Sequence, residues 1–173
     1  MVSFTKPNNA ILIAGNPIVQ ELEVKTATNC IPGRPVERDT TDAQIKVGTA
    51  AGNVIGWLGY EQASKQYRPA NISTAYAAND QAPVLSGGGF VILGRLASGQ
   101  NVVKGARLVA AASGELTAAS ALVVPTGATT VTSNAAQPNI SGAYGSQGIV
   151  VAIAEESVDA SGSAKDIMVR SLI

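Results

Sequence analysis

The feature that most constrains this chain is a turn signal about every ten residues, between short runs rich in β-branched side chains. Such signals occur at Pro32-Gly33, Asn79-Asp80, Gly87-Gly88-Gly89, Ser98-Gly99 and Ser113-Gly114. The runs between them are too short for most helices and are typical of strands in a sandwich or barrel. We therefore expect an all-β fold with little helix, either a small β-barrel or a β-clip-like domain.

Period-two alternation gives the clearest single strand, over residues 19–26. Leu22 and Val24 would face the core, while Glu21 and Glu23 would face solvent. The one short helix that we expect covers residues 61–67 and ends before Arg68-Pro69. Further strands are expected within residues 36–47 and over residues 52–60, 72–76, 82–85, 90–96, 101–105, 106–112, 115–119, 148–154 and 167–173.

The two ends of the chain differ from its middle in organisation. Residues 1–18 contain six Pro, Asn and Gly breakers within eleven positions, which predicts an extended N-terminal arm that is loosely held in the free protein. Residues 19–173 are expected to form a single β-rich domain. Within it, residues 120–146 are rich in Ala, Thr, Ser and Asn, and form either a long surface excursion or two weak strands.

Composition excludes several classes of function. The chain of 173 residues has 12 Lys and Arg against 12 Asp and Glu, which argues against nucleic acid and anionic membranes as partners, since both attract basic surfaces. It has no histidine and one cysteine, so His-based nucleophile systems, imidazole metal sites and an internal disulfide are ruled out. We expect no enzyme activity, no metal and no cofactor.

Segments that would direct the chain to a membrane are also not expected. The longest apolar stretch near the start covers residues 10–14, shorter than the about 7–15 residues of a signal-peptide core. No run approaches the about 18 apolar residues of a membrane-spanning helix. These observations predict a soluble protein that is made in the cytoplasm of its host cell.

Four local motifs admit both a chemical and a structural interpretation. Cys30 is either a small buried hydrophobe or a thiol activated by Arg34. Trp57 and Tyr60 form either a ligand platform or the bulk of a core that is otherwise built from small side chains. The glycine triplet at residues 87–89 precedes a strand instead of a helix, which favours a bulge or tight corner over a phosphate cradle. The acids at residues 37, 39 and 42 are expected in a solvated turn with salt bridges.

The order of several motifs resembles that of the capsid cement, or head decoration, proteins of tailed viruses and prophages. The motifs are Ile31-Pro32-Gly33-Arg34-Pro35-Val36, Val54-Ile55-Gly56-Trp57-Leu58-Gly59-Tyr60-Glu61, Gly87-Gly88-Gly89-Phe90-Val91, Gly99-Gln100-Asn101-Val102-Val103-Lys104-Gly105-Ala106-Arg107-Leu108 and Gly148-Ile149-Val150-Val151-Ala152-Ile153-Ala154-Glu155-Glu156. The resemblance covers about residues 22–173 and implies a trimeric β-rich subunit on the outside of a mature capsid.

The same resemblance implies that the N-terminal arm contacts the major capsid protein. The apolar residues that we expect to make this contact are Phe4, Ile11, Leu12 and Ile13. A chain with only 14% charged residues, about half the usual share, also favours association into a homotrimer.

Three functions from different classes follow from these observations. The first is a virion protein that stabilises the head by binding between capsomers. The second is a β-barrel module that binds a carbohydrate or another small ligand at Trp57 and Tyr60. The third, an enzyme on a dUTPase-like scaffold, lacks the sequence motifs that this chemistry requires.

Overall fold

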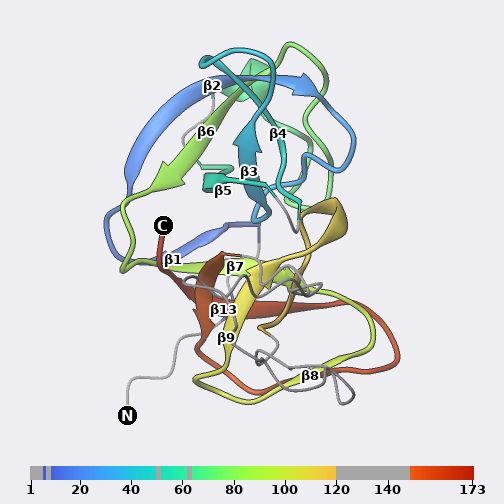
Figure 1. Ribbon diagram of the computed structural model, residues 1–173. Helices are drawn as coiled ribbons and strands as arrows, with labels where there is room; N and C mark the ends of the chain where they lie inside the picture. The colour runs from blue at the N-terminus through green and yellow to red at the C-terminus, as the bar shows by residue number, and fades with distance from the viewer. Residues whose placement is uncertain (1–5, 7–8, 50–51, 62–63, 120–148) are drawn as a thin grey trace, which may run out of the picture.

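The computed structural model describes residue 6 and residues 9–49, 52–61, 64–119 and 149–173. In this part of the chain there are thirteen β-strands and two 3-10 helices of three residues each. The expected all-β class is confirmed, and so is its closure into a barrel. The termini and most of the strands are labelled in Figure 1.

Five strands close into a barrel, which forms the upper part of the molecule in Figure 1. Their order around the barrel is β2-β4-β3-β5-β6, in which β2 and β4 are parallel and the other neighbouring pairs are antiparallel. The interior is filled by aliphatic side chains from these strands, most of them small or β-branched, together with Cys30 and Tyr76 from loops. The strands are β2 (Ile18–Thr26), β3 (Pro35–Arg38), β4 (Gln44–Val47), β5 (Val54–Leu58) and β6 (Gln81–Ser86).

The lower part of the molecule is a six-stranded sheet in the order β1-β7-β10-β9-β11-β13. An additional pairing between β7 and β13 joins five of these strands into a ring. A separate two-stranded ribbon of β8 and β12 lies beyond it. These strands are β1 (Leu12–Ala14), β7 (Val91–Leu96), β8 (Gln100–Val102), β9 (Arg107–Ala110), β10 (Leu116–Ala118), β11 (Val150–Ala154), β12 (Val158–Ala160) and β13 (Lys165–Ser171).

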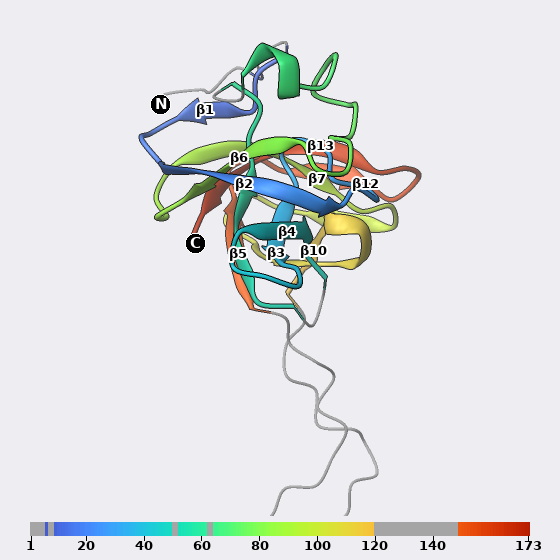
Figure 2. The same cartoon turned by 90° about the horizontal axis from the view of Figure 1, so that it is seen from above.

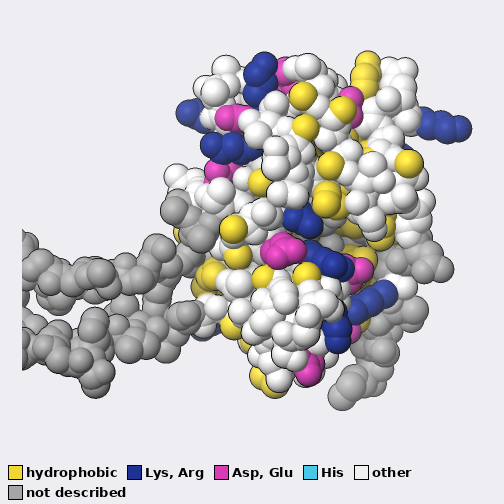
Figure 3. All heavy atoms as spheres, turned by 90° about the vertical axis from the view of Figure 1, so that its right-hand side faces the viewer, with side chains coloured by type: hydrophobic (Ala, Val, Ile, Leu, Met, Phe, Trp, Pro, Cys, Tyr) yellow, Lys and Arg dark blue, Asp and Glu magenta, His cyan; other side chains and the backbone are white. Residues whose placement is uncertain are grey.

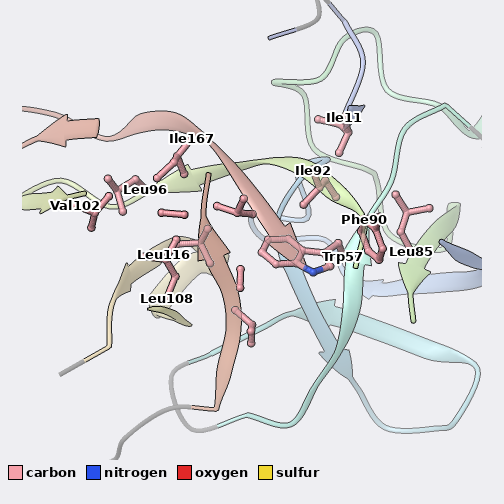
Figure 4. Packing of buried hydrophobic residues seen from close by; sticks show 14 of the residues in the cluster. Ile11, Trp57, Leu85, Phe90, Ile92, Leu96, Val102, Leu108, Leu116 and Ile167 are labelled. Atoms are coloured by element: carbon pink, nitrogen blue, oxygen red, sulfur yellow. The ribbon is translucent and has the colours of Figure 1, made fainter. Parts of the chain in front are cut away.

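The largest hydrophobic cluster connects the barrel to the six-stranded sheet. Trp57 of β5 and Leu85 of β6 enter it from the barrel, while Ile92 and Leu116 enter it from the sheet. Figure 4 shows the indole of Trp57 at the centre of this packing, with Phe90 and Leu85 on one side. Because one hydrophobic cluster packs against both the barrel and the six-stranded sheet, removing apolar residues from one of them would weaken the packing of the other.

The N-terminal segment differs from the loosely held arm that its breakers predict. Ile11 is only 2% exposed and belongs to the largest core cluster. Strand β1 pairs with β7, and the Glu61 carboxylate accepts the main-chain N–H groups of Ile11 and Leu12. The breakers at residues 15–17 therefore make the turn from β1 into β2, instead of keeping the whole segment extended. Of the expected arm, residues 1–5 and 7–8 lie outside the described residues.

Three other expectations are changed or left open by the structure. Residues 72–76 form no strand, and of the expected helix only the 3-10 turn Lys65–Tyr67 is present among its described residues. The glycine triplet makes the tight corner between β6 and β7, where all three residues have positive φ angles that favour glycine. The excursion expected at residues 120–146 lies outside the described residues. Figure 2 shows the described body from above.

Candidate functional site

The N-terminal half of β2 presents an open sheet edge. Residues 18–21 pair with β6 on one side, whereas β4 joins the other side only from Glu23 onward. The Glu23 N–H donates to the Ala43 carbonyl at 2.9 Å, so the main chain of alternate residues points to that same side. Val19 and Glu21 therefore direct their main-chain N–H and C=O groups to an edge that no described strand covers.

Exposed apolar side chains lie along this edge. Ile18 is 67% exposed and Val19 is 41% exposed, both at the start of β2. Leu172, which is 48% exposed, lies on the β6 side of β2 instead, because the glycine corner follows β6 and a Cβ built on Gly88 would lie 3.6 Å from the Leu172 carbonyl carbon. We refer to Ile18, Val19 and the open main chain of Glu21 as the β2 edge patch. Open edges with exposed apolar residues are sites where another chain can add a strand.

The β2 edge patch is a site that sequence reasoning does not find. The sequence pattern groups Ile18 with the arm and gives no sign of its exposure. The available signal is the apolar pair Ile18-Val19 immediately after the breakers, at the start of a strand whose alternation is clean only from Glu21 onward. The edge beside that pair is open because β4 begins only opposite Glu23, which a strand pattern does not reveal.

The candidate ligand platform is part of the core. Trp57 is fully buried, and Tyr60 is also buried, with the Arg68 guanidinium carbon 5.1 Å from the centre of its ring. Of the two interpretations of these aromatic residues, the structure supports the core. A carbohydrate would need an exposed ring face on which to stack, and neither residue offers one.

The apolar residues expected to contact the capsid are engaged within the protein itself. Ile11 is buried, while Leu12 and Ile13 are half-buried against neighbouring clusters. The expectation that Ile11 is available for a partner is therefore corrected, because its side chain completes the core beside β7. Phe4 lies outside the described residues.

The acidic loop forms salt bridges, as its sequence predicts. Lys46 Nζ lies 3.6 Å from Glu37 Oε1 and 4.0 Å from Asp39 Oδ1, and Arg38 pairs with Asp42. Glu37 itself is buried and not solvated, and it also accepts hydrogen bonds from Thr49. These contacts hold the β3–β4 hairpin in place, and they occupy the carboxylates that an acid–base mechanism would require.

Cys30 is a buried thiol inside the barrel. Its Sγ donates to the Thr26 carbonyl at 3.1 Å, and burial raises the pKa of the thiol to about 11, an effect that the Arg34 charge only partly offsets. A thiol that stays protonated at neutral pH is a poor nucleophile. Of the two interpretations of Cys30, the structure supports the small hydrophobe.

The described part of the chain was compared with two further kinds of site, a metal centre and a membrane-spanning helix. Within the described ranges, no group of three or more His, Cys, Asp or Glu side chains is placed to hold a metal ion. Among those same residues, no helix has the length and apolar character needed to span a bilayer.

The features of the described molecule are those of an all-β structural protein. Its barrel and six-stranded sheet share one core, a strand edge is open, and charges of both signs are interspersed on the face shown in Figure 3. The model of the XM1 gp53 minor capsid protein family matches residues 4–168, and the chain belongs to this family. The protein is thus a capsid-associated structural component of a phage virion, and the expected kinship with phage capsid-associated proteins is confirmed.

The chain is similar over most of its length to a phage structure, among other solved structures. That structure is described as the head fiber gp8.5 N base in bacteriophage phi29, with 9% sequence identity and a TM-score of 0.47. The similarity covers 89% of this chain and 92% of the other. No curated protein sequence matches the chain.

Proposed function

We propose that this protein is a head decoration, or cement, protein. It binds the outer surface of the capsid between capsomers and stabilises the mature head. Its partner is the major capsid protein, and it acts by binding without catalysing a reaction. Membership of a minor capsid protein family is the observation that carries this proposal.

The β2 edge patch supports the proposal with a mode of attachment. An extended segment of the major capsid protein would pair with the main chain of Val19 and Glu21, and would cover the side chains of Ile18 and Val19. Strand addition gains hydrogen bonds and apolar burial together. Each main-chain hydrogen bond contributes about 0.5–1.5 kcal/mol, and each buried aliphatic side chain about 1.5–3 kcal/mol. In this proposal the β2 edge patch, and not a free N-terminal arm, makes the contact with the capsid.

The oligomeric state belongs to the same proposal. A homotrimer would place three copies of the β2 edge patch around one axis, so that several weak contacts act together on the capsid. The neutral, charge-poor composition favours such self-association.

The test is co-sedimentation of the purified protein with capsids that lack it. We expect saturable binding, and we expect decorated heads to withstand a higher temperature before they release their DNA than undecorated heads. A protein that stays in the supernatant at micromolar concentration, or that binds without raising this temperature, would contradict the proposed role.

Two residues of equal exposure provide a matched pair for the mode of attachment. Ile18 in the patch and Val103, beyond the end of β8, are each 67% exposed. The substitution Ile18→Glu should abolish co-sedimentation, because it places a charge on the surface to be buried. Val103→Glu should bind like the wild type. Equal binding of both variants would refute the patch as the contact. The decoration function itself is tested separately, by co-sedimentation of the wild-type protein.

A further inference from the structure

The carboxylate of Glu21 is a charge without a counterion at the open β2 edge. Of residues 18–21, which line the open part of this edge, only Glu21 is charged. It makes no salt bridge with a described Lys or Arg side chain, whereas its neighbour Glu23 accepts a hydrogen bond from Gln44. Partial burial raises the pKa of Glu21. Water is thus partly withdrawn from a negative charge that no described cation compensates.

The neighbours of Glu21 within the sheet are known on one side only. Its register partner on β6 is Pro83, and that of Val19 is Leu85, so the β6 side offers apolar side chains. Val19, Glu21 and Glu23 alternate onto one face of β2. The position opposite Glu21 on its other side is open among the described strands, because β4 begins only opposite Glu23. A strand added there would supply the missing cross-strand neighbour.

Both ends of the open edge are fixed, which limits the length of an added strand. Pro17 precedes β2 and has no main-chain N–H to donate. At the other end, the Glu23 N–H is already bonded to the Ala43 carbonyl. The free stretch therefore covers residues 18–21, about 13 Å at 3.3 Å per residue. A short extended segment of about four residues fits it.

The charge of Glu21 restricts which segment can be added. A neighbouring strand removes more water from this carboxylate, and an unpaired charge is costly to bury. Directly opposite residues of opposite charge stabilise a strand pair, and like charges destabilise it. A basic side chain across from Glu21 therefore favours the addition of a strand, and an acidic one opposes it.

The same charge argues against a second copy of this edge as the occupant. An antiparallel pair of β2 edges that uses the main chains of both Val19 and Glu21 has its two-fold axis at Gln20. In that pair the two Glu21 residues are diagonal neighbours on one face, about 7–8 Å apart, and their carboxylates repel each other. Charges on edge strands commonly prevent such self-pairing.

We propose that the segment of the major capsid protein that adds to the β2 edge patch carries a lysine or arginine opposite Glu21. The inference rests on the proposed decoration function and names the chemistry of the partner at the same patch. The basic side chain pairs with the Glu21 carboxylate, while apolar neighbours in the segment cover Ile18 and Val19. Glu21 is thus the residue that determines the specificity of this edge.

The first experiment needs no capsid. The main-chain amide signals of Val19 and Glu21 are followed in ¹H–¹⁵N spectra as N-acetyl-Thr-Val-Lys-Val-Thr-amide is added. The matched probe has Glu in place of Lys and the same length and alternation. We expect the Lys peptide to bind about tenfold more tightly, because an attractive cross-strand pair replaces a repulsive one. Equal affinities, or no saturable shift with either peptide, would overturn the proposal.

Exchange of the charge on the protein makes the test specific. The Glu21→Lys variant should prefer the Glu peptide, and Glu21→Gln should bind the two peptides about equally. Asp159→Lys is the control, because it changes the net charge by the same amount at an exposed position of β12 and should keep the wild-type preference. Unfolding midpoints show that each variant is folded, and Glu21→Gln still tests the pairing if Glu21→Lys is unstable. An unchanged preference in either Glu21 variant contradicts the proposed pairing.

The second experiment measures co-sedimentation with undecorated capsids. Glu21→Lys should weaken binding about tenfold, and Asp159→Lys should bind like the wild type. Wild-type protein that binds, together with a Glu21→Lys variant that binds equally well, overturns the inference and leaves the decoration function intact. Wild-type protein that does not bind capsids refutes the decoration function, and with it the partner named here.

Discussion

Trp57 donates its indole N–H to Ser171 Oγ at 3.0 Å, although 114 positions separate the two residues in the chain. Trp57 lies on β5 of the barrel and Ser171 on β13 of the six-stranded sheet, and both are fully buried. The Ser171 hydroxyl in turn donates to the Ile173 carbonyl at 2.6 Å. This short chain of hydrogen bonds connects the two sheets and the C-terminus at the centre of the shared core.

Truncation of Trp57 should therefore destabilise the whole molecule. We expect Trp57→Ala to lower the free energy of unfolding by about 3–5 kcal/mol, because it leaves a cavity between the sheets. Ser171→Ala should cost less, about 1–3 kcal/mol, since it leaves the indole N–H without its acceptor. Urea unfolding followed by circular dichroism measures both. Midpoints equal to that of the wild type would show that Trp57 does not support the core.

Ile11 should behave as a core residue despite its place near the N-terminus. We expect Ile11→Ala to cost about 2–5 kcal/mol, the range for aliphatic truncation in a core. Ile18→Ala is the control: it makes the same change at an exposed site, and the free energy of unfolding should stay within about 0.5 kcal/mol of the wild type. Thermal unfolding of the two variants compares them directly. Equal melting temperatures of the two variants would support the interpretation of the N-terminal segment as a loosely held arm.

The Cys30 thiol should make stability fall in alkaline solution. Its pKa is raised to about 11 by burial, whereas an unfolded chain has a thiol pKa of about 8.5. The stabilisation is complete below the unfolded value, and it is lost as the pH rises toward the folded value, because only the unfolded state then releases the proton. Under reducing conditions, unfolding free energies at pH 7 and pH 10 should diverge more for the wild type than for Cys30→Ala. Parallel pH profiles would contradict this prediction.

Two glycines with similar backbone angles should differ in their tolerance of alanine. Gly33 has φ +84° and Gly105 has φ +89°, so both substitutions place a side chain in the left-handed region. A Cβ at Gly33 would lie 2.3 Å from the Leu93 carbonyl oxygen, while none of the described atoms lies within 4 Å of one at Gly105. We expect Gly105→Ala to cost about 1–2 kcal/mol and Gly33→Ala about 3 kcal/mol or more. Chemical denaturation checks the difference, and equal costs would rule out the close approach at Gly33.

The proposed homotrimer predicts a specific sedimentation result. At micromolar concentration we expect a single species with three times the mass of the 17.5 kDa chain. A stable interface of this kind should bury more than about 1,000 Å². A monomer at that concentration would refute the trimer. It would not contradict binding of the protein to capsids.

Much of the local structure could be predicted from the sequence because its causes are local. The alternation of Leu22 and Val24 with charged neighbours predicts a half-buried strand, and β2 includes these residues. The glycine triplet predicts a corner because its neighbours are strand-like and positive φ angles suit glycine. The salt bridges of Lys46 could also be predicted from the sequence, since its acidic partners belong to the same hairpin.

The structural role of the N-terminal segment and the candidate contacts depend on the tertiary structure. The breakers before residue 18 are compatible with a free arm, yet pairing with β7 and the Glu61 carboxylate hold Ile11 and Leu12 in place. Similarly, nothing in a strand pattern shows that β4 leaves the edge at Val19 open.

What the sequence alone determined was the all-β class, the main turns, the neutral net charge and the resemblance to capsid proteins. These depend on composition and on residues that are neighbours in the chain. The tertiary structure decided the burial of Ile11 and Trp57, the open β2 edge and the position of Glu21 beside it. Each of these depends on which distant strands pair and where they stop, because burial and charge proximity depend on distances in space.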